Sequence, residues 1–121
     1  MPDLLEQSAA WLDGQRHQHL SRPVIYRRGS QEVELQATVG QTVFRLSDQY
    51  GATIRHVSRD YLIRAQDLVF DSTTVRPERG DLIVEGERIY EVMSPSANEP
   101  EWRWSGGFGK TLRIHTQETA S

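Results

Sequence analysis

Two-residue alternation between apolar and polar side chains over residues 32–39 is the feature that most constrains the fold. The apolar positions are Val33, Leu35, Ala37 and Val39, and the polar positions between them are Glu32, Glu34, Gln36 and Thr38. Successive side chains of a β-strand point to opposite faces, so this stretch predicts a half-buried strand with one face toward water. Further strands are predicted within residues 24–26, 42–46, 52–59, 82–84, 89–92 and 112–114.

Turn signals separate these short strands. Gly40, between Val39 and Gln41, predicts a turn, and Gly86 predicts a tight hairpin between residues 82–84 and 89–92 because glycine takes positive φ readily. Several short strands with closely spaced turn signals are typical of an antiparallel barrel or sandwich. We therefore predict a mainly β fold: a small antiparallel β-barrel or sandwich of about six or seven short strands, with one N-terminal α-helix.

The length of 121 residues suits a single domain over residues 1–121. Within residues 1–20, Leu5, Ala9 and Leu12 recur at helical spacing and predict the N-terminal helix. Residues 22–116 are predicted to form the β-barrel, and residues 117–121 a flexible tail. The 71–80 loop and the 94–110 loop region are long for a small barrel, and long loops commonly carry function, so we expect them to contact neighbours.

Composition excludes several classes of protein. The chain has no cysteine, which excludes a disulfide framework, a thiolate metal site and a cysteine nucleophile. No apolar run approaches the roughly 18 residues of a membrane span, so no membrane partner is expected. The 14 basic and 17 acidic residues give a net charge of −3, which argues against general adhesion to nucleic acid or anionic lipid.

Neither a metal site nor a catalytic centre is predicted. The histidines His17, His19, His56 and His115 lack the spacing of a zinc site. Ser58 and Asp60 lie near His56, but neighbouring residues of a strand alternate between its faces, so no triad geometry follows. Residues 106–111 resemble a phosphate-binding loop in composition but not in spacing. We predict no catalytic residues, no metal and no cofactor, and hence no enzyme.

Charge and aromatic residues concentrate in the C-terminal half. Residues 78–101 contain seven acids against Arg79 and Arg88, a local net charge of −5. This segment is predicted to be a solvated or subunit-facing acidic surface. Trp102 and Trp104 share one face of an extended segment and are typical of core or interface anchors. The basic residues Arg22, Arg27 and Arg28 would complement an acidic segment of a neighbouring subunit.

Several segments resemble one family. Pro77-Glu78-Arg79-Gly80-Asp81-Leu82-Ile83, followed by Gly86-Glu87-Arg88-Ile89-Tyr90-Glu91-Val92, resembles the hairpin of tailed-phage head–tail joining proteins. Trp102-Arg103-Trp104-Ser105, followed by Leu112-Arg113-Ile114-His115-Thr116, is similar to the closing segment of prophage members. Ser58-Arg59-Asp60-Tyr61-Leu62-Ile63 also fits, so that the resemblance covers roughly residues 22–116. Gly106-Gly107 departs from the more acidic turn expected there.

The resemblance implies a structural virion protein of a tailed phage or prophage. It implies a stopper-type β-barrel protein that assembles in the host cytoplasm into a homo-oligomeric ring in the virion neck. Such a ring joins the portal or adaptor of the DNA-filled head to the tail terminator or tail tube, and genomic DNA passes through it without sequence-specific binding. The family supplies no catalytic residues.

A neck ring needs contacts between its subunits. The candidate subunit-interface residues are Trp102, Arg103, Trp104, Phe108, Arg27 and Arg28. A lumen that passes DNA should not be strongly basic, because phosphate contacts would retain the DNA; the candidate lumen-facing acids are Glu85, Glu87, Glu99 and Glu101.

Two alternatives stay open. One is a tail-terminator or tail-completion ring protein. The other is an OB-like barrel that binds single-stranded nucleic acid or an oligosaccharide, for which Tyr26, Tyr61, Arg59 and Arg64 would supply the binding face.

Overall fold

The structure, a computed structural model, describes residues 21–119 of the chain. Their β-strands are β1 (Arg22–Arg28), β2 (Gln31–Ser47), β3 (Thr53–Arg64), β4 (Val69–Phe70), β5 (Thr73–Thr74), β6 (Leu82–Glu85), β7 (Arg88–Val92), β8 (Trp102–Trp104) and β9 (Thr111–Glu118). A 3₁₀ turn, η1 (Ala65–Asp67), follows β3. The N-terminal helix predicted over residues 1–20 lies outside the described residues.

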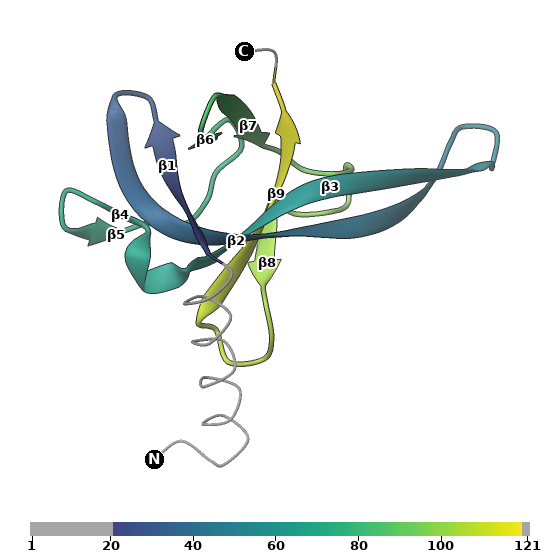
Figure 1. Cartoon of the computed structure of the whole chain (residues 1–121). Helices are drawn as coiled ribbons and strands as arrows, with labels where there is room; N and C mark the ends of the chain where they lie inside the picture. Colours follow the sequence, from purple (N-terminus) through teal and green to yellow (C-terminus); the bar gives the residue numbers. More distant parts are fainter. Residues whose placement is uncertain (1–20, 120–121) are drawn as a thin grey trace.

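A closed antiparallel barrel forms the body of the molecule. Its strands follow the order β3-β2-β1-β6-β7-β9, and the pairing of β3 with β9 closes the sheet into six strands (Figure 1). On its other edge, β9 pairs first with β8 at residues 112–114 and then with β7 at residues 116–118. The mainly β barrel predicted from the alternation is therefore confirmed.

Alternate residues of each strand fill the barrel interior. The core consists of Val24, Tyr26, Leu35, Ala37, Tyr61, Ile63, Ala65, Leu68, Phe70, Ile83, Tyr90, Val92, Leu112 and Ile114. Val33 and Val39 pack against it, so the odd-numbered residues of 33–39 face inward as the alternation predicts. The 82–92 hairpin is also confirmed: Glu85 pairs with Arg88 across the loop Gly86-Glu87, and Gly86 has the positive φ of +61° that a type II′ turn needs at its first position.

The turn predicted at Gly40 is wrong, because β2 runs unbroken from Gln31 to Ser47. A Cβ atom at this position would lie 3.3 Å from Leu62 Cδ1 and 3.5 Å from Arg113 Nη1. The glycine thus permits close approach of two side chains from neighbouring strands. On β2, Leu35 and Ala37 belong to the core, whereas Phe44, beyond Gly40, is buried against His115 at a ring-centroid distance of 5.2 Å.

A two-stranded ribbon projects from the barrel. β2 and β3 stay paired from Thr38 opposite Leu62 out to Ser47 opposite Thr53, whereas β9 covers β3 only over residues 59–64. Residues 42–58, here called the distal ribbon, therefore extend beyond the barrel wall, on the right of Figure 1. Its tip is fixed by Asp48, whose Oδ1 accepts hydrogen bonds of 2.8 Å from the backbone N–H groups of Tyr50 and Ala52.

Two predicted boundaries need correction. The flexible tail was predicted to begin at residue 117, but β9 continues to Glu118 because Gln117 and Glu118 pair with Glu91 and Tyr90 of β7. The predicted 71–80 loop contains β5, which pairs with β4 through a two-residue turn at Asp71 and Ser72. Both turn residues have positive φ, of 48° and 66°, as a type I′ turn requires.

Candidate functional site

A buried polar cluster lies on the outer side of β2, β3 and β9. Asp60 has no exposed surface, and its carboxylate accepts hydrogen bonds from Ser58 Oγ at 2.6 Å, His115 Nδ1 at 2.9 Å and Arg113 Nη1 at 2.7 Å, as well as from the Thr42 hydroxyl. Burial opposes ionisation of Asp60, but the hydrogen bonds from His115, Ser58, Thr42 and Arg113 outweigh it and lower its pKa to about 2. Asp60 therefore stays ionised, and the Arg113 guanidinium at 2.7 Å balances its charge.

This cluster brings together a serine, a histidine and an aspartate, but not in the arrangement of a catalytic triad. The histidine is His115 rather than the nearby His56 of the sequence. In a triad, serine and aspartate use different ring nitrogens. Here Ser58 Oγ and Asp60 Oδ1 both approach Nδ1, at 3.4 and 2.9 Å, and Ser58 donates to Asp60 directly. His115 is also buried, so the network ties strands together rather than presenting a nucleophile.

A second network surrounds Glu85, one of the candidate lumen-facing acids. Its carboxylate accepts hydrogen bonds from Arg59 at 2.8 Å, Tyr61 at 2.6 Å and Arg22 at 2.8 Å. The Arg59 guanidinium also lies 4.6 Å from the ring centroid of Tyr90. Burial opposes ionisation, but the bonds from Tyr61, Arg22 and Arg59 lower the Glu85 pKa to about 2. Two arginines of the same chain neutralise this charge.

A third network explains the Gly-Asp motif of residues 77–83. The buried Asp81 accepts bonds from the Tyr26 hydroxyl, from Arg28 Nε at 3.0 Å and Nη2 at 2.8 Å, and from the Glu78 backbone N–H at 2.9 Å. Burial and the bond to Asp81 raise the pKa of Tyr26 above its usual range. Gly80 precedes Asp81 with φ +94°. The motif therefore fastens the 71–80 loop to β1, and Arg28, a candidate interface residue, pairs within its own chain.

The two long loops meet at an aromatic surface. Trp102 packs partly buried against the core, and its ring lies 5.2 Å from that of Trp104 in an edge-to-face contact. The Arg76 guanidinium of the 71–80 loop lies 5.2 Å from the Trp104 ring. Trp104 and Phe108 remain exposed. We call Arg76, Trp104 and Phe108 the aromatic loop surface, because the structure joins loops that the sequence analysis selected separately.

The other candidate residues lie on the surface. Arg103, Glu87 and Glu99 are exposed, and Glu101 lies 4.0 Å from Arg79. Arg27 pairs with Glu32 of the adjacent strand at 2.9 Å. Trp104 and Phe108 both belong to the 94–110 loop region, whereas Arg27 and Arg28 lie on β1.

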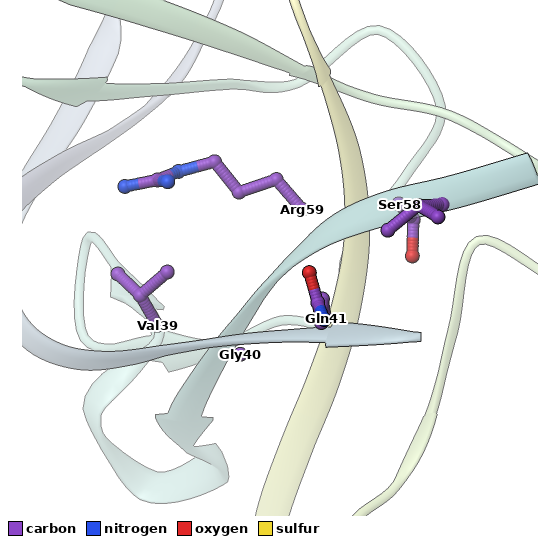
Figure 2. A pocket seen from close by; sticks show the side chains of 6 residues that line it. Val39, Gly40, Gln41, Ser58 and Arg59 are labelled. Atoms are coloured by element: carbon purple, nitrogen blue, oxygen red, sulfur yellow. The ribbon is translucent and has the colours of Figure 1, made fainter. Parts of the chain in front are cut away.

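An open hollow of about 410 Å³ lies where the distal ribbon leaves the barrel. It is lined by Val39, Gly40, Gln41, Val57, Ser58 and Arg59, and Figure 2 shows these side chains around it. The binding face proposed for an OB-like barrel does not form, because Tyr26 and Tyr61 are buried in the core.

The distal ribbon is a surface that the sequence does not predict. Its exposed apolar side chains are Val43, Tyr50, Ile54 and Val57. The alternation of residues 42–58 predicts strands. It does not indicate that these strands lack a covering neighbour.

Within residues 21–119, no group of three or more histidine or acidic side chains is placed to hold a metal ion. The same part of the chain contains no helix long and apolar enough to cross a membrane.

The fold defines a small β-barrel protein with a projecting two-stranded ribbon and two exposed loops. The sequence matches the family described as phage head-tail joining protein over residues 2–121, and the chain belongs to this family. A comparison with curated proteins finds no match. The family resemblance is thereby confirmed. The chain is a structural protein of the phage neck, where it contacts other head and tail proteins of the virion.

Proposed function

We propose that the chain is a stopper-type neck protein that assembles into a homo-oligomeric ring between head and tail. The portal or adaptor lies on the head side of this ring, and the tail terminator or tail tube lies on the other side. Assembly takes place in the host cytoplasm, and genomic DNA passes through the ring without sequence-specific binding.

The observation that carries this proposal is the separation of two exposed surfaces on one closed barrel. In Figure 1 the distal ribbon and the β8–β9 turn leave the barrel in different directions. A ring subunit needs different surfaces for its two neighbours, because each contact in a ring joins unlike patches. Further surface is then needed for the proteins above and below the ring.

The aromatic loop surface suits one of these axial contacts. Tryptophan and arginine are enriched among the residues that dominate binding energy at interfaces. Trp104 and Arg76 already stack on each other, so little side-chain freedom remains to be lost when a partner binds. We assign this surface to the head or tail partner and leave the distal ribbon for contacts within the ring.

The acids Glu87 and Glu99 suit the lumen better than Glu85 and Glu101. Glu87 and Glu99 are exposed, and neither forms an ion pair within residues 21–119. Unpaired carboxylates repel phosphates, which favours passage of DNA over retention. Glu85 lacks this effect because Arg22 and Arg59 neutralise it.

Electron cryomicroscopy of particles that contain this chain tests the proposal. A ring of this chain between portal and tail tube is the expected result, with Trp104 and Phe108 against an axial neighbour. A ring at the tail-side end of the neck would make the chain a tail terminator instead. Particles with full neck density but without this chain would contradict the proposal.

A further inference from the structure

We propose that the ring is held by the distal ribbon of one copy lying across the outer face of β1, β6 and β7 in the next copy. The inference rests on the proposed function, because it names the contact that joins neighbouring subunits of the ring. It assigns the occupant of the ribbon surface to a second copy of this chain.

One face of the distal ribbon combines valines with arginines. The strand register places Val43 opposite Val57 and Arg45 opposite Arg55, and residues two apart on a strand share a face. The two valines are 39% and 41% exposed. We call these four residues the ribbon face.

The arginine pair is unfavourable in an isolated chain. Like charges directly opposite each other on paired strands destabilise the pairing. Neither Arg45 nor Arg55 forms an ion pair in the described part of the chain. Both side chains are exposed beside apolar surface. The ribbon face therefore fits a partner that offers apolar side chains together with carboxylates.

The outer face of β1, β6 and β7 offers this combination. The register aligns Ile25 with Val84 and Val84 with Ile89, which makes a row of apolar side chains across three strands. Their chain neighbours Tyr26, Ile83 and Tyr90 fill the interior, so the row points outward. All three residues of the row remain partly exposed.

Two carboxylates border this row. Glu34 lies on β2, directly opposite Ile25 of β1. Glu91 of β7 lies opposite Leu82 of β6, two pairs along from Ile89 and Val84 and therefore on the same face. Both acids are exposed, and neither forms an ion pair within residues 21–119. We call Ile25, Val84, Ile89, Glu34 and Glu91 the receiving face. It matches the ribbon face in apolar character and opposes it in charge.

The position of the two faces favours a ring over a symmetric dimer. In the closed order β3-β2-β1-β6-β7-β9, β6 lies three strands from β3 in either direction. The receiving face is thus across the barrel from the strand that carries half of the ribbon, as Figure 1 shows for β6 and the ribbon. A contact between unlike faces on opposite sides repeats from copy to copy and closes into a ring when the rotation permits.

Disulfide crosslinking tests the contact directly, because the chain has no cysteine of its own. Val57→Cys combined with Ile89→Cys, supplied as the only copy of this chain in assembling particles, is expected to give a ladder of covalent multimers after oxidation. Val57→Cys combined with Lys110→Cys is the matched control and should give no ladder. Covalent dimers from Val57→Cys alone would overturn the head-to-tail arrangement.

Charge reversal gives an independent test. Arg45→Glu combined with Arg55→Glu should lower incorporation of the chain into particles about tenfold, because glutamates would then face Glu34 and Glu91. Adding Glu34→Arg and Glu91→Arg to the same chain should restore incorporation. Melting curves of the isolated variants verify folding, since the ribbon face contributes no ion pair to the isolated chain.

The outcomes separate this inference from the proposed function. A ring that is visible in the neck but shows no Val57–Ile89 crosslink, or that tolerates the charge reversal, would overturn the inference and leave the proposed function intact. Absence of the unmodified chain from the neck would overturn both.

Discussion

His115 Nδ1 lies 2.9 Å from Oδ1 of Asp60, a carboxylate with no exposed surface, and the two residues are directly opposite each other on β9 and β3. The bond therefore spans the pair of strands that closes the barrel. Arg113 and Ser58 complete the network around the same carboxylate. A cluster that first suggests catalytic chemistry serves instead to hold the closure.

Replacing the central carboxylate should destabilise the protein strongly. Asp60→Asn keeps the shape of the side chain but leaves Arg113 without its counter-charge, which should lower the free energy of unfolding by about 3 kcal/mol. Urea denaturation measures the loss. The matched control is Glu32→Gln, which removes an exposed pair with Arg27 and should cost less than about 1 kcal/mol. Equal losses in the two variants would contradict the assigned role.

Stability should fall in acid between pH about 4.5 and about 2. The folded-state pKa values of Asp60 and Glu85 are both lowered to about 2, from ordinary values of 3.8 and 4.5. The stability from a carboxyl group with a depressed folded pKa is fully present above its unfolded pKa and is lost as the pH falls through the folded one. The midpoint of thermal unfolding, followed from pH 7 to pH 2, should therefore hold steady and then drop. Asp60→Asn should flatten that drop, and an unchanged drop would refute the contribution of Asp60.

The hydroxyl group of Tyr26 should contribute measurably to stability. Tyr26→Phe leaves the buried Asp81 carboxylate with one hydrogen bond fewer, at a cost of about 1–2 kcal/mol. Tyr50→Phe makes the same chemical change at a residue that is 85% exposed on the ribbon tip and should have no effect. Calorimetric unfolding of both variants gives the comparison, and a neutral Tyr26→Phe would show that the bond to Asp81 adds nothing.

The two tryptophans should separate folding from assembly. Trp102→Ala removes a ring packed against the core and should cost about 3 kcal/mol of stability. Trp104→Ala removes an exposed ring and should leave the melting temperature nearly unchanged, while lowering the number of tailed particles. Denaturation of the purified variants and particle counts by electron microscopy give the two readouts. Comparable loss of stability in both would contradict the division.

Local sequence patterns predicted much of the fold. The alternation of residues 33–39 identified the inward face of β2, and Gly86 identified the tight hairpin, since both signals depend on near neighbours. The turn predicted at Gly40 was wrong. From the sequence alone, a glycine needed for the close approach of Arg113 looks the same as a glycine needed for a turn. That distinction depends on a strand more than 70 residues away in the sequence.

The candidate site was predicted only in part, for a similar reason. Trp102 and Trp104 share a face as their spacing indicates, but only the packing of β8 on β9 shows which ring is exposed. Arg28 is a predicted interface residue, and its pair with Asp81, 53 positions further along its own chain, was not predictable from the local sequence. Val43 and Val57 are exposed because β9 pairs with β3 only over residues 59–64. The local sequence around the two valines does not indicate where that pairing ends.

The pairing of β9 with three other strands also affects how the chain folds during synthesis. Residues 111–118 join β3, β7 and β8, and they emerge from the ribosome after every other strand of the barrel. Until then β3 has an open edge whose backbone groups are free to pair with another nascent chain. Contacts that join residues about 50 positions apart also form slowly. The final strand therefore sets the interval during which this protein is most vulnerable to aggregation in the infected cell.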